Sequence, residues 1–286
     1  MAEKIILLGA SGQLGRQLRA TRPEDIELLP LGHTELDICD SLAVKSLFQT
    51  FQPTQIINAA AYTKVDDAEK NSDAAFAVNA HGPEVLAENC PASCRIIHIS
   101  TDFVFDGKSE KPYQPYDETR PISIYGKSKL EGERNLQSRR PDSVVIRTAW
   151  LYSAQGKNFL NTMLRLMAER EELGVVADQF GTPTSVNSLA EVIWRFIAKP
   201  ELHGIYHWTD QGKASWFEFA SEIQRLALEA KLLDKKIPIR ALSTEEYPTP
   251  ARRPAYSVLD KELTYLAIGK TGQPWQTELK RVLADI

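Results

Sequence analysis

The N-terminal segment constrains the fold more than any other part of this chain. Lys4–Leu8 is a short apolar run of the kind found in buried strands, and the glycine-rich sequence GASGQLG, residues 9–15, follows it directly. Leu14–Leu18 then continues in helical spacing. Glycines between a buried strand and a helix let the backbone turn and approach a pyrophosphate, which the helix N-terminus stabilises. The G-x-x-G-x-x-G spacing therefore predicts a dinucleotide-binding loop.

The rest of the N-terminal half repeats the alternation of apolar strands with amphipathic helices. Further strands are predicted at Glu27–Leu31, Gln55–Asn58, Arg95–Ser100 and Val144–Thr148. Helices are predicted at Leu42–Phe51, Ala74–Cys90 and Ser123–Leu136. Continuous apolar strands that alternate with helices indicate a parallel sheet covered on both faces. We therefore expect an α/β fold with a doubly wound, Rossmann-type parallel sheet.

The pattern changes in the C-terminal half. Helices are expected at Phe159–Glu171, Ser188–Ala198 and Phe217–Lys231, whereas Pro238–Tyr256 is rich in Pro, Thr and Arg and reads as an irregular loop. We expect residues 1–150 to form a dinucleotide-binding domain, completed by part of 173–200. Residues 151–286 would then form, for the most part, a smaller substrate-binding lobe.

Composition and charge narrow the class of protein. Apolar residues make up 43% and charged residues 25% of the 286 residues, as in ordinary soluble domains. A net charge of −4 gives no reason to expect a nucleic-acid or membrane partner. The chain shows no signal-peptide pattern and no apolar run long enough to span a membrane. The three cysteines and five histidines lack metal-binding spacing. We expect a cytoplasmic protein with structural thiols, its histidines serving as surface or core residues.

A tyrosine and a lysine four residues apart point to proton-transfer chemistry. Tyr125 and Lys129 lie in the predicted helix Ser123–Leu136, where residues i and i+4 share one face. A free tyrosine has a pKa of roughly 10, and a neighbouring ammonium lowers it. The pair could therefore exchange a proton with a substrate oxygen. Alone this pattern is common on solvated helices, and its weight depends on the rest of the chain.

Three strand ends supply further candidates, because ligands of doubly wound sheets bind at the carboxyl ends of the strands. Small residues in Asn58–Thr63 permit close approach of a cofactor. Thr101 follows a strand and could donate a hydrogen bond to a carbonyl oxygen. Trp150 follows another and offers a flat apolar face to a sugar or nicotinamide ring. Together with Tyr125 and Lys129, these residues form one predicted site.

The choice between NADPH and NADH stays open at this point. No carboxylate stands at the tip of the second strand, which ends at Leu31-Gly32-His33, although Glu35 and Asp37 follow shortly after. An acid at that tip would bind the ribose of NADH and repel a 2′-phosphate. Its absence, with Arg16 and Arg19 near the glycine loop, is compatible with NADPH.

These motifs, taken in order, resemble the extended short-chain dehydrogenase/reductase family, whose members carry G-x-x-G-x-x-G and Y-x-x-x-K on a doubly wound fold. The similarity spans nearly the whole chain. Beyond the glycine loop its carriers are NAAAYTKVDDAE (58–69), STDFVFDG (100–107), YGKSKLEGE (125–133), RTAWLY (147–152), QFGTPTS (179–185) and RRPAYSVLD (252–260). Each motif is generic alone, but their order is specific.

The resemblance implies a role for each matching residue. Tyr125 would be the proton donor, Lys129 its pKa partner and ribose anchor, and Thr101 the third member of a catalytic triad. The cofactor would contact Gly9, Ser11, Gly12, Gln13, Leu14, Gly15, Asp37, Ile38, Ala60, Ala61 and Tyr62, besides Tyr125 and Lys129. The substrate would contact Thr101, Asp102, Val104, Phe105, Trp150, Gln179 and Arg253.

The activity implied is NADPH- or NADH-dependent reduction of a nucleotide-linked keto sugar. The implied substrate is dTDP-4-dehydro-L-rhamnose, and its product dTDP-L-rhamnose would serve cell-wall polysaccharide synthesis. Some members of the family use magnesium at a dimer contact between acidic side chains. A homodimer and Mg²⁺ are therefore compatible with the resemblance, but no carboxylate cluster in the sequence identifies such a site, and no residue is predicted as a metal ligand.

Three alternatives share the fold. A 4,6-dehydratase needs a carboxyl pair after the threonine, and Phe103 stands where the second carboxyl is needed. A nucleotide-sugar epimerase keeps Tyr, Lys and Thr, and this sequence is compatible with it. A non-catalytic NADP-binding regulatory subunit, of the kind that partners methionine adenosyltransferase, keeps the fold and the cofactor pocket. The intact Tyr125, Lys129 and Thr101 favour catalysis.

Overall fold

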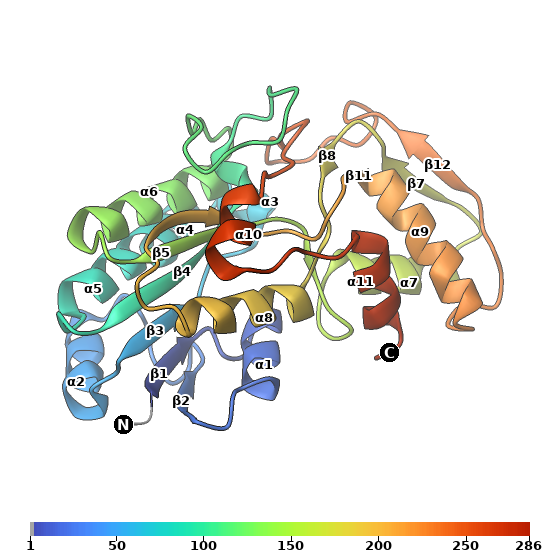
Figure 1. The fold of residues 1–286 in the computed structure, drawn as a ribbon. Coiled ribbons are helices and arrows are strands. Elements are labelled where there is room, and N and C mark those ends of the chain that lie inside the picture. The colour runs from blue at the N-terminus through green and yellow to red at the C-terminus, as the bar shows by residue number, and fades with distance from the viewer. Residues whose placement is uncertain (1–2) are drawn as a thin grey trace.

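A six-stranded parallel sheet organises the molecule. The structure is a computed structural model that describes residues 3–286, and Figure 1 shows the sheet with helices on both sides. The strand order is β10-β5-β4-β3-β1-β2, and every neighbouring pair is parallel. The strands are β1 (Glu3–Leu8), β2 (Ile26–Leu31), β3 (Gln55–Asn58), β4 (Arg95–Thr101), β5 (Val144–Thr148) and β10 (Gly204–His207). The predicted doubly wound fold is confirmed.

The strand order reverses beside β1. This strand pairs with β2 on one side and with β3 on the other, and Leu8 lies opposite both Leu31 and Asn58. The chain therefore leaves β1 in one direction and crosses back over it to reach β3. In parallel α/β sheets ligands bind outside the carboxyl ends of the strands at such a reversal. Gly9 and Ala59 follow β1 and β3 at this point.

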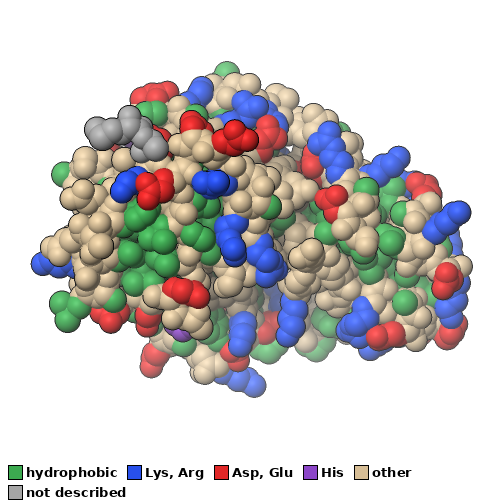
Figure 2. Space-filling view, turned by 90° about the horizontal axis from the view of Figure 1, so that it is seen from below, with side chains coloured by type: hydrophobic (Ala, Val, Ile, Leu, Met, Phe, Trp, Pro, Cys, Tyr) green, Lys and Arg blue, Asp and Glu red, His purple; other side chains and the backbone are tan. Residues whose placement is uncertain are grey.

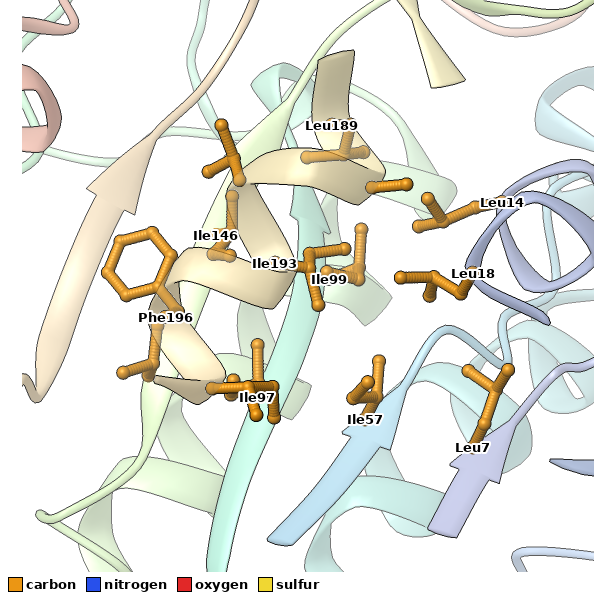
Figure 3. Packing of buried hydrophobic residues seen from close by; sticks show 14 of the residues in the cluster. Leu7, Leu14, Leu18, Ile57, Ile97, Ile99, Ile146, Leu189, Ile193 and Phe196 are labelled. Atoms are coloured by element: carbon orange, nitrogen blue, oxygen red, sulfur yellow. The ribbon is translucent and has the colours of Figure 1, made fainter. Parts of the chain in front are cut away.

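One face of the sheet is covered by α1 (Gln13–Ala20) and α8 (Val186–Ile197). Leu14 and Leu18 of α1 and Ile193 of α8 pack on Leu7 and Ile57 of the strands, as Figure 3 shows. All five side chains are buried. Full burial of one such side chain stabilises a fold by roughly 1.5–3 kcal/mol. The amphipathic spacing of α1 thus fixes the glycine loop against the sheet.

The opposite face is covered by α2 (Ser41–Phe51), α5 (Gly82–Asn89) and α6 (Ile124–Arg139). Their buried residues Phe48, Leu86 and Leu136 meet Ile6 and Ile56 of the sheet. Because α6 carries Tyr125 and Lys129, this packing presents both side chains toward the end of β4.

A second hydrophobic core lies beside the sheet, on the right of Figure 1. Met167, Phe219, Ile223 and Leu279 are among its buried residues. Its elements are α7 (Phe159–Glu169), β7 (Leu173–Val176), α9 (Trp216–Glu229), β12 (Ile239–Leu242) and α11 (Trp275–Leu283). Between them the chain returns to the first core through α8, β10 and α10 (Glu262–Ile268). The chain therefore crosses between the two cores several times after β5.

Two predicted elements differ from the structure. The segment Pro238–Tyr256 was expected to be irregular, but it contains β12, which pairs in parallel with β7. A four-residue strand carries little periodicity, so its partner decides its conformation. The predicted helix Ala74–Cys90 is instead α4 (Ser72–Phe76), a π-helical turn at Ala77–His81, and α5. Pro83 has no N–H to donate within the helix, which favours a wider turn before it.

Several short elements carry no sequence signal of their own. They are α3 (Val65–Ala68), a 3₁₀ turn at Asp102–Val104, and the two-residue strands β6 (Leu151–Tyr152), β8 (Phe180–Gly181), β9 (Thr184–Ser185) and β11 (Ala214–Ser215). The sheet strand β10 was not predicted either. It completes the sheet by pairing with β5 from Gly204 to His207.

The surface mixes both signs of charge. Figure 2 shows basic and acidic side chains interspersed over the lower face of the molecule, with smaller apolar areas between them. Within residues 3–286, none of the helices combines the length and the apolar character needed to cross a bilayer.

Candidate functional site

The glycine loop requires glycine at two of its positions. Gly9 has a φ of +78°, and a Cβ there would lie 2.6 Å from the Ala59 carbonyl oxygen. A Cβ on Gly15 would lie 2.3 Å from the Gly9 oxygen. Gly12 ends the turn as the N-cap of α1 and brings no capping side chain. The first N–H groups of α1 can therefore donate to an anionic ligand, as expected of a pyrophosphate-binding loop.

The other residues of the loop have distinct surroundings. Ser11 is exposed, whereas Leu14 is buried in the core under α1. The Gln13 side chain accepts hydrogen bonds from the Ser153 hydroxyl at 2.7 Å and the Asn158 amide at 2.8 Å. Gln13 therefore ties the loop to the segment that leads into α7.

The segment after β2 forms a turn beside the loop. Asp37 is exposed, and its carboxylate accepts from the Cys39 N–H at 3.0 Å. Ile38 is buried against α5, where a Cβ on Gly82 would lie 2.5 Å from Ile38 Cδ1. An acidic side chain and a buried aliphatic one thus stand next to each other at the end of β2.

The segment after β3 is held by the π-helical turn. The Tyr62 N–H donates to Asn79 Oδ1 at 2.8 Å, and Asn79 Nδ2 donates back to the Tyr62 carbonyl at 3.1 Å. The Tyr62 hydroxyl donates to Asp67. Ala60 and Ala61 come directly before these reciprocal hydrogen bonds in the sequence and are half-buried. Small side chains therefore line the chain where β3 leaves the sheet.

The end of β4 places Thr101 and Asp102 side by side. Thr101 caps the 3₁₀ turn by accepting from the Phe103 N–H at 3.2 Å, and its hydroxyl donates to Asp102 Oδ1 at 3.1 Å. Burial raises the pKa of Asp102 to about 6, although the hydroxyls of Ser257 and Thr101 offset part of this effect. Asp102 Oδ2 is buried and accepts no hydrogen bond from the described residues.

Val104 and Phe105 lie behind this turn. Both are fully buried, and Phe105 stacks on Tyr113 with ring centroids 4.1 Å apart. Their side chains form the wall that supports the turn.

Helix α6 brings Tyr125 to the same place. The helix begins at a Ser123 cap, and Glu69 accepts from the Ile124 N–H at 2.8 Å. A Cβ on Gly126 would lie 2.2 Å from the Phe103 oxygen, and one on Gly132 would lie 2.0 Å from the Asn79 oxygen. Two glycines thus let the helix approach the backbone of its neighbours, and Tyr125 meets the Phe103 ring edge-on.

The pKa of Tyr125 differs from the prediction. Burial raises the pKa of Tyr125 to about 12, the Thr101 hydroxyl lowers it in part, and the Asp102 carboxylate raises it. The expected lowering by Lys129 is therefore not seen. Burial lowers the pKa of Lys129 itself to about 8, with an opposing contribution from Glu133. The reason is the direction of the lysine side chain, whose Nζ donates to the Ile99 carbonyl at 2.6 Å.

A buried ion pair beneath the site has no counterpart among the predicted residues. Arg147 of β5 binds both oxygens of Glu133 on α6, at 2.7 Å for the shortest contact, and both side chains are 2% exposed. Ser100 donates to the same carboxylate, and Arg147 also donates to the Pro115 carbonyl. The YGKSKLEGE and RTAWLY motifs contain Glu133 and Arg147, but nothing in them indicates that the two pair.

Trp150 stands at the contact between the two cores. Its backbone has a φ of +48°, and its ring stacks on Trp216 at a centroid distance of 3.4 Å and an interplanar angle of 8°. A Cβ on Gly181 would lie 2.6 Å from the Trp150 ring. Trp216 was not predicted as a site residue, because helical aromatic spacing alone indicates only a buried face.

Gln179 lies between β7 and β8, and Arg253 lies in the segment that follows β12. Gln179 is buried and donates to the Thr244 hydroxyl at 3.0 Å. Arg253 binds both carboxylate oxygens of Asp66 on α3, at 3.0 and 2.7 Å. This ion pair fastens the C-terminal loop to the segment that follows β3.

No group of three or more His, Cys, Asp or Glu side chains within residues 3–286 has the arrangement needed to hold a metal ion. The magnesium ion considered from the sequence stays a prediction.

Comparison with known proteins gives the family. The family model described as RmlD substrate binding domain matches residues 3–286. This chain belongs to that family. Among its relatives, the dTDP-4-dehydrorhamnose reductase of Aggregatibacter actinomycetemcomitans is 41% identical, with 98% of each chain covered.

Solved structures of the family agree in fold. The dTDP-4-dehydrorhamnose reductase of Bacillus anthracis in complex with NADP is 38% identical, with a TM-score of 0.94 and full coverage of both chains. The orthologue from Clostridium acetobutylicum is 40% identical, with a TM-score of 0.92 and 98% of each chain covered.

Proposed function

We propose that this protein reduces the 4-keto group of dTDP-4-dehydro-L-rhamnose with NADPH, giving dTDP-L-rhamnose. The observation that carries the proposal is that Tyr125 of α6 packs edge-on against Phe103, whose N–H Thr101 caps at the carboxyl end of β4. The glycine loop follows β1, which belongs to the same parallel sheet as β4. The names of the reductases that match along almost the whole chain support the substrate.

The residues present fit a dinucleotide cofactor. Gly9, Gly12 and Gly15 leave room for a pyrophosphate, and the free N–H groups at the start of α1 would bind it. Asp37 and Ile38 would contact the adenosine part, and Ala60, Ala61 and Tyr62 the nicotinamide side. The NADP complex of the relative from B. anthracis favours NADPH over NADH. When bound, the cofactor supplies the hydride for the carbonyl carbon.

Tyr125 would donate the proton that the reduced oxygen needs. A pKa of about 12 keeps the phenol protonated at neutral pH, as a general acid must be before the reaction. Thr101 would donate a hydrogen bond to the same oxygen and so stabilise the charge that develops there. The resulting Tyr125 phenolate must regain a proton. Lys129 Nζ points to the Ile99 carbonyl, so its ammonium would supply this proton through a hydroxyl or water placed between the two side chains.

The sugar would lie between the two cores. Asp102 has one carboxylate oxygen free of described partners and would accept from a sugar hydroxyl. The half-buried ring of Trp150 would pack on the deoxysugar. Gln179 and Arg253 would face the nucleotide part, and Val104 and Phe105 would support the wall behind.

The test is substrate-dependent loss of NADPH absorbance with dTDP-4-dehydro-L-rhamnose. Tyr125→Phe should bind NADPH normally and lose about 10²–10⁴-fold in kcat, the usual contribution of a positioned general acid. Tyr113→Phe is the matched control, because this tyrosine bonds to Asp106 away from Thr101. Near-full activity of Tyr125→Phe contradicts the role of Tyr125.

The same assay separates the alternatives. An epimerase would convert the sugar without net oxidation of added NADPH. A regulatory subunit would bind NADPH and a stoichiometric protein partner but turn over no keto sugar. A cytoplasmic location and a homodimer remain predictions, which cell fractionation and sedimentation would test.

A further inference from the structure

The side chain of Lys129 ends a buried chain of hydrogen bonds that the proposed mechanism does not use. Lys129 Nζ lies 3.3 Å from His98 Nε2, and His98 Nδ1 lies 3.1 Å from Asn58 Nδ2. Asn58 Oδ1 accepts from the Ala60 N–H at 3.2 Å. Lys129 is 1% exposed, and Asn58 and His98 are wholly buried. Water therefore does not reach these atoms, and the protein groups must satisfy one another.

The direction of each hydrogen bond follows from one fixed donor. The Ala60 N–H can only donate, so the oxygen of the Asn58 amide must face it. The amide nitrogen then faces His98 Nδ1 and donates to it. His98 Nδ1 consequently carries no proton, and an uncharged imidazole must carry its proton on Nε2.

His98 is uncharged in this setting. Burial is the larger cause that lowers the pKa of His98 well below its usual value, and a charged Lys129 would lower it further. Its Nε2–H therefore points at Lys129 Nζ, which can accept this proton only with the lone pair of a neutral amine. Nζ still donates its own hydrogen to the Ile99 carbonyl. Every group from Ala60 to Ile99 is satisfied when Lys129 is uncharged, whereas an ammonium would set N–H against N–H.

The charged groups near Lys129 do not override this arrangement. On its own helix, Tyr125 and Glu133 stand one turn away on either side, and Glu133 is bound by Arg147 of β5. From β4 it meets His98, and Asp102 acts on Tyr125. The neighbouring α3 and α5 carry acidic side chains that bind arginines elsewhere, namely Asp66 with Arg253, and Glu84 and Glu88 with Arg139. Burial remains the larger influence, and it too favours the neutral amine.

We propose that His98, oriented by Asn58, is a positioning residue that favours the uncharged amine of Lys129 and so sets the pH above which this lysine cannot return a proton to Tyr125. The inference rests on the proposed function for its catalytic meaning, because a proton is returned only if Tyr125 has donated one. The effect on the charge of Lys129 itself does not depend on turnover.

The direct test is an NMR titration of the protein with ¹³Cε-labelled lysine, with and without saturating NADP⁺. The Lys129 signal is assigned by its absence in Lys129→Arg. In His98→Gln the side-chain amide can turn its oxygen to an ammonium, so the charged form gains an acceptor. We expect the midpoint of Lys129 to rise by about one pH unit, a tenfold change in the protonation equilibrium.

A second variant reaches the same result by another route. In Asn58→Asp the carboxylate still accepts from Ala60 but draws the imidazole proton to Nδ1, which leaves Nε2 as an acceptor for the ammonium. The midpoint should again rise. His207→Gln is the matched control, because His207 is equally buried on β10 and bonds to the Tyr113 carbonyl instead. It should leave the Lys129 midpoint unchanged.

The outcomes distinguish the inference from the proposed function. An unchanged or lowered midpoint in folded His98→Gln and Asn58→Asp overturns the inference, whatever the activity. A raised midpoint in a protein that reduces no keto sugar supports the inference about Lys129 and rejects the function. In an active enzyme, the alkaline limb of the kcat profile should move upward with the midpoint in both variants and stay in place in His207→Gln.

Discussion

The candidate site has two parts, and they are held in place differently. One part lies at the end of the parallel sheet, and the other lies at the contact between the two cores. At the sheet end, β4, β5 and α6 hold Thr101, Tyr125 and Lys129 over a buried layer of polar side chains. At the core contact, a few side-chain contacts hold the loops, such as Trp150 on Trp216, and Asp66 with Arg253 and the Ala251 N–H. The groups proposed to move protons therefore rest on this buried polar layer, which we call the rigid frame. The groups proposed to select the substrate are held by the individual contacts between loops, which we call ties.

This contrast predicts that changes in the buried layer cost the most stability, while changes in the contacts that hold the loops chiefly alter substrate affinity.

The largest effect should come from breaking the buried ion pair. Arg147→Met leaves Glu133 buried without its partner, which typically destabilises a protein by about 3–5 kcal/mol. Chemical denaturation would measure the loss. Arg139→Met is the matched control, because its pairs with Glu84 and Glu88 are partly exposed and worth about 1 kcal/mol or less. Equal losses in the two variants would contradict the rigid-frame account.

The next largest effect is expected from Asp102, in the pH dependence of the free energy of unfolding. The folded-state pKa of Asp102 is raised from 3.8 to about 6, so the protonated carboxyl is favoured in the fold. Its stabilisation is complete below pH 4 and is lost as pH rises through 6. With about 1.4 kcal/mol per pKa unit, the loss is at most about 3 kcal/mol. Unfolding of Asp102→Asn from pH 4 to 7 should lack this decline.

The control for that experiment is Asp106, a carboxyl whose pKa is shifted in the opposite direction. Burial would raise the pKa of Asp106, but hydrogen bonds from the Lys108 N–H and the Tyr113 hydroxyl outweigh it and leave the pKa lowered. Asp106→Asn should therefore lose stability at neutral pH and be unchanged in acid. A parallel response of the two variants would show that the two aspartates are not distinguished by burial.

At the core contact, Trp216→Leu should weaken substrate binding and cost less stability than Arg147→Met, because Trp216 packs at the margin of the second core. It removes the surface on which the strained Trp150 is stacked, and aromatic pairs contribute about 0.5–1.5 kcal/mol beyond burial. We expect KM for the dTDP sugar to rise about 2- to 10-fold with NADPH affinity unchanged. Trp194→Leu, on α8 and bonded to Thr21, is the control. A larger fall in kcat than rise in KM would place Trp216 with the rigid frame.

The smallest effect is expected for Arg253→Lys. Lysine keeps the charge but cannot bind both Asp66 oxygens at once, and the pair is partly exposed, so about 0.5 kcal/mol is at stake. KM should rise about twofold, and 0.5 M salt should reduce the difference between the two proteins. Arg252→Lys, at an exposed position, should behave as the unchanged protein. A loss of NADPH affinity in Arg253→Lys would contradict the assignment of this tie to the substrate side.

Local sequence pattern was enough to predict the parallel sheet and the glycine loop. The glycine spacing after Lys4–Leu8 requires a turn that only glycine can make, and the structure shows that turn at Gly9 and Gly15. Apolar runs predicted five of the six sheet strands, and four of these five are central strands, whose residues are buried on both faces. The strand β10 was missed, since four residues that begin with glycine carry too little pattern.

The sequence by itself determined that Tyr125 and Lys129 share a helix and that Thr101 follows a buried strand, because helix periodicity and strand ends are local properties. Only the tertiary structure decided what surrounds them. Lys129 turns to His98 and Ile99, Glu133 pairs with Arg147, and Asp66 meets Arg253 across 187 positions of the chain. Such pairs arise from packing between elements far apart in sequence. Burial, which decides their charge, exists only once the sheet and helices have assembled.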